Sequence, residues 1–214
     1  MLAARPGRLP RPRGRKVKRQ KAALTVFLGL TLAGAVLGAV WALLAPSAHG
    51  VIALTRSGQR VQTYLGSESD HLFVSAALLI GLLTSMAIVA AVLVWQWRVH
   101  RGPLLATALW VGSVAAAGAA AGVGALLVRW HYGPVPFDTA PVSPEHRIFY
   151  YSEAPPVFFA HGPLQIATTL LFPAAVAALT YALMAVATPR DDLGALPPME
   201  RVLVTAGGTE PGPR

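Results

Sequence analysis

Five of the six histidines share two segments of the sequence with carboxylates, which is where metal chemistry would arise if these side chains converged. The group consists of His49, His71, His131, His146, His161, Asp138, Glu145 and Glu153. Zinc needs three or four convergent ligands, and a zinc-bound water would support hydrolysis. The spacing matches no recognised zinc pattern, so we expect no metal, no cofactor and ordinary loop histidines. One alternative stays open, an outer-face metal-dependent enzyme in which His131, His146 or His161 meets a carboxylate.

Other catalytic motifs are missing from the sequence. There is no cysteine, which excludes disulfides, thiolate ligands and a cysteine nucleophile. Ser143 and Ser152 lack the sharp turn motif of a serine nucleophile. No phosphate-binding Gly-x-x-x-x-Gly-Lys-Ser/Thr loop occurs. The sequence therefore predicts a protein that is not an enzyme.

The elements that carry these residues are set by hydropathy. Hydrophobic residues make up 54% of the chain and charged residues 13%, against roughly a quarter charged in ordinary soluble domains. Four stretches contain no Lys, Arg, Asp, Glu or His, namely residues 22–46, 72–97, 104–128 and 163–188. Each exceeds the roughly 20 residues that a helix needs to cross a bilayer. The predicted fold is therefore an all-α transmembrane four-helix bundle, and uncharged spans argue against ion-coupled transport.

The basic residues predict the orientation. Most of the 18 Lys and Arg residues lie before residue 22, between the second and third spans, or after residue 188. The positive-inside rule then places a disordered leader (1–21) and a flexible tail (189–214) in the cytoplasm, and the loops 47–71 and 129–162 outside. A cleaved secretory signal is the other interpretation of the first span, but the span is longer than the roughly 7–15 residues of a signal core.

The leader is expected to contact anionic lipid headgroups. Its cations next to the first span are Arg15, Lys16, Lys18, Arg19 and Lys21. Each cation near an anionic leaflet contributes about 1 kcal/mol of membrane attraction. No folded nucleic-acid-binding motif accompanies them, so we expect membrane lipids and no nucleic acid as partners.

Small residues predict how the spans pack, because helices in lipid associate through close contact of backbones. Gly34 and Gly38 form one four-residue repeat, and Gly118 and Gly122 form another. We interpret both as tight contacts within the bundle; a docking face for another membrane subunit is the alternative. Pro173 predicts a kink in the fourth span, and the kink could shape a lipid groove with Gln165 as its polar handle.

The outer loops predict a small extracytoplasmic cap. Two β-prone runs, 51–56 and 60–65, flank Ser57-Gly58-Gln59, which indicates a β-hairpin, and 147–152 is a candidate third strand. Aromatic residues lie in and after that strand, among them Tyr150, Tyr151, Phe158 and Phe159. They either rest the cap on the membrane surface or contact a partner or lipid.

Three stretches carry a resemblance to a known family. They are Leu54 to Ser69 (LTRSGQRVQTYLGSES), Trp95 to Pro103 (WQWRVHRGP), and Ala154 to Ala160 (APPVFFA) followed by Pro163-Leu-Gln-Ile166. The sequence resembles, over about residues 22–194, small actinobacterial four-span membrane proteins of unknown function. The resemblance implies residence in a mycobacterial inner membrane and an accessory role in a mammalian-cell-entry (Mce) lipid transporter. It implies no catalytic residues.

The functional hypothesis is accordingly a non-enzymatic inner-membrane protein that acts as an accessory or stabilising subunit of a lipid transporter, together with other integral membrane subunits. An independent lipid or small-molecule carrier is the alternative.

Overall fold

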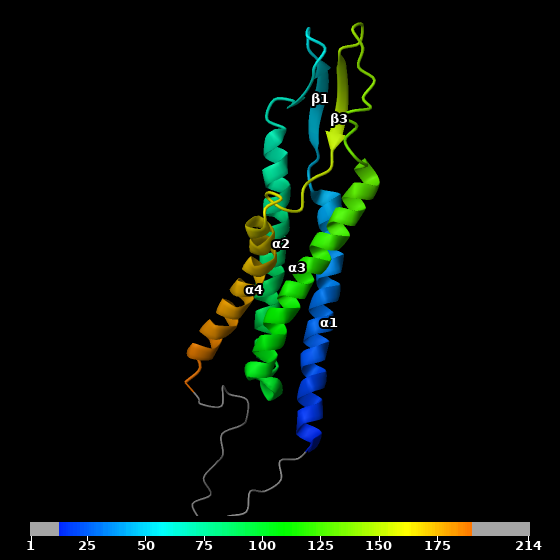
Figure 1. Cartoon of the computed structure of the whole chain (residues 1–214). Helices are drawn as coiled ribbons and strands as arrows, with labels where there is room; N and C mark the ends of the chain where they lie inside the picture. Colours follow the sequence, from blue (N-terminus) through cyan, green and yellow to red (C-terminus); the bar gives the residue numbers. More distant parts are fainter. Residues whose placement is uncertain (1–12, 190–214) are drawn as a thin grey trace, which may run out of the picture.

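The computed structural model describes residues 13–189, with the side chains of residues 13–18 and of residue 99 outside that description. The chain forms four long helices and a three-stranded sheet that extends from one end of them (Figure 1). The helices are α1 (Arg13–Leu44), α2 (Ser69–Gln96), α3 (Pro103–Tyr132) and α4 (Pro163–Val186), with a short 3-10 turn η1 (Arg98–His100) before α3. All four are long and apolar enough to cross a membrane, which confirms the prediction of four long apolar helices.

The two ends of the helices differ in what they carry. The sheet end holds the three strands, and the termini end holds the first residues of α1 and the last residues of α4 (Figure 1). Pro103 and Pro163 occupy the first turns of α3 and α4, where a missing backbone N–H costs no hydrogen bond. Gly133, with φ of 69°, ends α3 at the sheet end in the conformation that favours glycine.

The first helix is longer than the sequence predicted. It begins at Arg13, so the prediction of disorder is wrong for residues 13–21. Arg, Lys and Gln are good helix formers, and extending an existing helix avoids the cost of nucleation. The rest of the predicted leader, residues 1–12, and the tail from residue 190 lie outside the described residues.

The sheet consists of β1 (Ala48–Leu54), β2 (Arg60–Tyr64) and β3 (Ile148–Glu153) in the order β2-β1-β3, with both pairings antiparallel. The predicted hairpin is confirmed: β1 and β2 are joined by a turn in which Gly58 has φ of 80°. Only three residues separate the end of α1 from β1, and the strands run along the long axis of the helices (Figure 1). The sheet therefore stands up from the helix ends, along the direction of the helices (Figure 1).

The two faces of the sheet differ in what covers them. Ile52 and Tyr151 lie on one face and pack against Ala140, Val135 and Val142 from the segment before β3. Arg60 Nη1 fastens that segment by donating a hydrogen bond to the Phe137 carbonyl oxygen at 2.7 Å. The opposite face carries Val61, Ile148 and Tyr150, which are 46%, 57% and 66% exposed.

The helices pack in a chain of pairs, with α3 between α1 and α4, and α4 also against α2. One core cluster lies toward the termini end and includes Leu30, Ala91, Leu109 and Tyr181. The second lies toward the sheet end around Trp41, Leu83, Ala120 and Val157.

Candidate functional site

The seam between α1 and α3 brings two helix backbones into close contact. A Cβ added to Gly34 or Gly38 would overlap the backbone of Ala116 or Ala120 respectively. Small residues repeat every fourth position along the facing stripe of α3, which consists of Gly112, Ala116, Ala120 and Gly124. A Cβ on Gly124 would lie 2.8 Å from the Trp41 ring, so the missing side chain makes room for that tryptophan. Without these glycines the two backbones could not approach this closely.

The second glycine pair lies elsewhere. Gly118 and Gly122 are exposed, and a Cβ added to either would meet no atom within 4 Å. The prediction that they pack tightly within this bundle is therefore wrong. The seam uses positions 112, 116, 120 and 124 of α3, and a helix turns about 100° per residue, so Gly118 and Gly122 fall on the opposite face.

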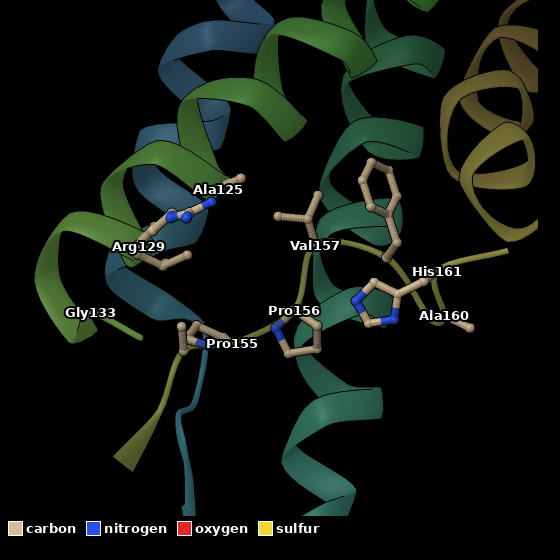
Figure 2. A pocket seen from close by; sticks show the side chains of 11 residues that line it. Ala125, Arg129, Gly133, Pro155, Pro156, Val157, Ala160 and His161 are labelled. Carbon is tan, nitrogen blue, oxygen red and sulfur yellow. The ribbon is translucent and has the colours of Figure 1, made fainter. Parts of the chain in front are cut away.

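The bare face of α3 leads to a pocket at the sheet end (Figure 2). Ala125 and Arg129 continue the face of Gly118 and Gly122 at helical spacing, and both line the pocket. The segment between β3 and α4 forms the opposite wall. The full lining is Ala125, Val128, Arg129, Gly133, Ala154, Pro155, Pro156, Val157, Phe158, Ala160 and His161, around a cavity of about 310 Å³.

Two basic side chains border this largely apolar pocket. Figure 2 shows Arg129 projecting from α3 toward Val157, with its guanidinium nitrogens beside Ala125, while Pro156 and His161 lie across the opening. No Asp or Glu lines the pocket. Among the described residues, the ion pairs involve only His49, His71 and Glu68, so no carboxylate pairs with Arg129 there. The pocket can therefore accept a group with an apolar part and an anionic part.

The aromatic residues singled out in the sequence divide between surface and core. Tyr150 is exposed on the bare face of the sheet, whereas Tyr151 is 8% exposed on the covered face. Gln62 Nε2 donates a hydrogen bond to the Tyr151 hydroxyl oxygen, and burial raises the pKa of that hydroxyl. Surface contact is thus the wrong role for Tyr151, because successive strand residues point to opposite faces.

Phe158 and Phe159 follow the same division. Phe158 packs against the core cluster around Trp41 and lines the pocket. Phe159 is 40% exposed, and its ring centroid lies 5.1 Å from that of Phe73 on α2. Both rings thus fix the segment that forms one pocket wall.

Pro173 does not line a lateral groove. Its side chain is fully buried, and α4 runs as one helix from Pro163 through Pro173 to Val186. Gln165 is exposed at the start of α4, two turns away. The groove predicted from these two residues is therefore wrong, because the proline ring fills interior space.

Glu68 holds two of the five loop histidines. Its Oε2 lies 3.1 Å from His49 Nδ1 and 2.9 Å from His71 Nδ1. The hydrogen bond from His49 lowers the pKa of Glu68, and the nearby His71 adds to the shift. Within residues 13–189 no three His, Asp or Glu side chains form a group that could hold a metal ion. His131, His146 and His161 thus do not converge with the carboxylates as the metalloenzyme alternative requires.

A hydrogen-bonded junction joins α1, β1 and α2 next to this carboxylate. Trp41 Nε1 donates to the Ser75 carbonyl oxygen at 2.8 Å, and Ser75 Oγ donates to the Pro46 carbonyl oxygen at 2.9 Å. His71 Nδ1 lies 2.9 Å from the Ser47 carbonyl oxygen. This junction could not be predicted from the sequence, since its members come from distant positions and make side-chain to backbone bonds.

At the termini end, Arg101 ties the α2–α3 connection to α2. Its Nε donates to the Trp95 carbonyl oxygen at 2.7 Å, and its guanidinium lies 4.2 Å from the Trp95 ring centroid. Tyr181 of α4 packs edge-on against the same ring. The predicted lipid contacts Arg19 and Lys21 are exposed at this end, whereas the side chains of Arg15, Lys16 and Lys18 lie outside the described part of the chain.

Four helices of membrane-spanning length and composition, joined to a small sheet, define a multi-pass membrane protein. Residues 30–195 match the family described as "Protein of unknown function (DUF2567)", and the chain belongs to that family. It is 52% identical over 175 residues to the uncharacterized protein Rv1591 of Mycobacterium tuberculosis (strain H37Rv), covering 81% of this chain and 91% of that protein. It is 50% identical over 183 residues to the uncharacterized protein ML1222 of Mycobacterium leprae, covering 86% and 89%. No solved structure matches at a significant level.

Proposed function

We propose that this protein is a non-enzymatic subunit of the bacterial plasma membrane that docks beside other integral membrane proteins and stabilises or regulates them. The basic residues near the helix ends favour cytoplasmic termini and a sheet outside the membrane. A lipid transporter is the assembly that we propose first. The Mce complexes implied by the family resemblance are the specific candidates.

The observation that carries the proposal is the bare face of the sheet. Ala53 pairs with Val61 on one side and with Ile148 on the other, and Val51 pairs with Tyr150. The exposed side chains therefore form one continuous apolar surface, and among the described residues no segment covers it. Apolar surface that a chain keeps contiguous and exposed is typical of a protein–protein contact.

The geometry of the sheet favours a membrane protein as the occupant of this face. The strands run along the helix axis and begin three residues after α1, so the sheet stands directly above the span (Figure 1). A partner that meets this face must extend beyond the bilayer at the same place. The extramembrane part of another integral membrane subunit meets that requirement.

Co-purification tests the docking surface. The tagged full chain is expressed at its native level, photocrosslinked through an amino acid placed next to Tyr150, and purified in several mild detergents. We expect transporter subunits to be recovered with the unchanged chain and with Gln59→Asp, a control in the exposed turn. Tyr150→Asp should lose them at unchanged thermal stability. Recovery of an uncrosslinked monomer in every detergent would overturn the proposal.

The orientation has its own test, because the chain contains no cysteine. Ser57→Cys places a single thiol in the turn between β1 and β2. A membrane-impermeant maleimide added to intact cells should label this variant. Labelling only after the cells are broken would place the sheet inside and contradict the proposed orientation.

The pocket at the sheet end favours a second candidate function, an independent lipid or small-molecule carrier. Its apolar walls and basic border suit an amphipathic ligand. The purified protein alone should then accelerate the transfer of a fluorescent phospholipid between vesicles. A transfer rate equal to that of vesicles without protein would count against the carrier.

A further inference from the structure

The exposed surface of α3 has a segment without large side chains. The exposed positions of α1 include Leu24, Leu28 and Leu32, and those of α4 include Leu164, Leu179 and Leu183. On α3, by contrast, the exposed face between Val111 and Leu126 contains Gly118, Gly122 and Ala125. A strip of α3 without large side chains therefore runs from Gly118 to Ala125, and a Cβ added to Gly118 or Gly122 would meet open space.

This bare face is continuous with the sheet-end pocket. Ala125 belongs to both, and Arg129 lies one helical turn beyond Ala125. The cavity of about 310 Å³ is at the lower end of the roughly 300–1,000 Å³ of small-molecule sites. A ligand held here has room for a headgroup at Arg129 and for a chain that extends along α3 into the bilayer.

Charge decides which end of the ligand lies in the pocket. Arg129 is the first charged residue after the apolar stretch of α3. In Figure 2 its guanidinium turns back beside Ala125, toward the apolar part of the helix. A guanidinium beside apolar side chains binds most favourably to an anionic group. Within residues 13–189 no carboxylate pairs with Arg129, whereas a phosphate accepts two parallel hydrogen bonds from one guanidinium.

We propose that this pocket binds an anionic phospholipid, with its phosphate on Arg129 and one acyl chain along Gly118, Gly122 and Ala125. His161 borders the phosphate from the opposite wall and donates a hydrogen bond through whichever ring nitrogen carries the proton. Trp130, which follows Arg129 and is 85% exposed, is a residue type that favours the headgroup level of a bilayer. This proposal rests on the second candidate function, the lipid carrier, and specifies its ligand. The two can be tested separately, because a lipid that binds here but is not transferred between vesicles supports the site and not the carrier.

Competitive lipid retention tests the proposal on the full chain. The purified protein is incubated in detergent with equal amounts of phosphatidylglycerol and phosphatidylcholine, and the bound lipids are counted by native mass spectrometry. The unchanged protein should retain mainly phosphatidylglycerol. Arg129→Gln should lower the ratio of the two bound lipids roughly tenfold, because it removes hydrogen bonds to a charged group. Arg56→Gln, in the exposed turn of the sheet, is the matched control and should keep the ratio.

The acyl-chain half of the site has a separate variant. Gly122→Leu places a large side chain on this strip and should reduce the retention of both lipids. Gly81→Leu is its control, because Gly81 on α2 is also exposed and has no atom within 4 Å of an added Cβ. Equal retention by the Gly122 and Gly81 variants would overturn the placement of the chain.

Three results would overturn the headgroup site. The first is an unchanged protein without preference for phosphatidylglycerol. The second is an Arg129→Gln protein that keeps the preference. The third is Arg129-dependent stabilisation by inorganic phosphate equal to that by phosphatidylglycerol, which would make this a site for the free ion. If Arg129→Gln does not fold, Arg129→Lys applies the same test, since lysine keeps the charge but loses the paired hydrogen bonds. Its preference should fall, and an unchanged preference would contradict the proposal.

Discussion

Two glycine pairs of identical spacing have opposite surroundings in this molecule. Gly34 and Gly38 lie against the backbone of α3, with no space for a Cβ, whereas Gly118 and Gly122 face open space. The first pair sets the distance between two helices. The second leaves a strip of the exposed surface of α3 without side chains. The same four-residue motif therefore indicates only that another group can approach the helix closely. Whether that group belongs to the same chain depends on how the helices are arranged.

The sheet repeats this contrast. Its Tyr151 face is closed by the segment that contains Ala140, and its Tyr150 face is open. Both α3 and the sheet thus pack one face against other parts of the chain. Their other face is exposed and available to a ligand or a partner. This difference can be tested by comparing a substitution at a packed position with a substitution at an exposed position.

The largest effect is expected from Gly38→Leu. The new side chain would overlap the backbone of Ala120, so α1 and α3 would have to separate. Overfilling a close contact of this kind costs about 3 kcal/mol or more. A thermal melt in detergent, followed through tryptophan fluorescence, should show a strongly lowered midpoint. Gly29→Leu, on the exposed side of α1, is the control, and equal losses in both variants would contradict the contrast.

The next effect is expected from Trp41→Phe. Trp41 is fully buried in the seam beside Gly124 and donates a 2.8 Å hydrogen bond to the Ser75 carbonyl oxygen. Losing that bond and part of the ring should lower the free energy of unfolding by about 2 kcal/mol. Trp130→Phe on the exposed surface of α3 should change it by less than about 0.5 kcal/mol. The free energy of unfolding of both variants is measured by denaturant titration in detergent. Similar losses in the two variants would contradict the stabilising role of the buried Trp41.

A smaller, pH-dependent effect is expected on the covered face of the sheet. Partial burial, together with the hydrogen bond donated to Glu153, raises the pKa of Tyr64 to about 12. A raised pKa stabilises the folded state below the usual value near 10, and that contribution is lost as the pH rises toward about 12. Tyr64→Phe should therefore flatten the fall in melting temperature between pH 10 and 12. Tyr150→Phe, on the bare face, should leave that slope unchanged, and an effect of equal size would contradict the difference between the faces.

Glu68 supplies the corresponding test at acid pH. The hydrogen bond from His49 lowers its pKa, so its stabilising contribution is present above the usual carboxyl pKa and disappears as the pH falls through the lowered value. Glu68→Gln should remove this acid-dependent part of the melting temperature and leave the α1–α3 seam unaffected. A melting profile identical to that of the unchanged protein would contradict the assignment.

The smallest effect is expected from Gly122→Ala. A Cβ at this position meets nothing within 4 Å, and alanine favours a helix over glycine by roughly 1 kcal/mol at most. The melting temperature should stay constant or rise slightly. A clear fall would show that the bare face packs against something within the bundle.

The spans were predictable because the bilayer enforces a simple rule. A charge within the hydrocarbon is costly, so uninterrupted apolar runs such as 72–97 mark a helix regardless of its neighbours. The helix ends were less predictable, since α3 continues past Val128 to Tyr132 without needing lipid around its last turn. The hairpin followed from local turn chemistry at Gly58.

The site residues were harder to predict, because they depend on which face of an element is covered. Tyr150 and Tyr151 are neighbours in sequence, and the alternation of a strand separates them only when the covered side is known. On α3, either the small residues at 112, 116, 120 and 124 or those at 118 and 122 could have formed the contact with a neighbouring helix. Only the position of α1 in the structure shows that the first set does so. A usable signal for the pocket did exist, since Arg129 follows Gly118, Gly122 and Ala125 at helical spacing.

The junction at Pro46 and Ser47 has a mechanical consequence. The bonds that Trp41, Ser75 and His71 make there leave no free pivot between the first helix and the first strand. A sideways tilt or axial rotation of α1, imposed by a change in bilayer thickness or by a neighbouring protein, would thus be carried to the strands as the same movement. The orientation of the sheet would therefore follow the tilt and rotation of α1.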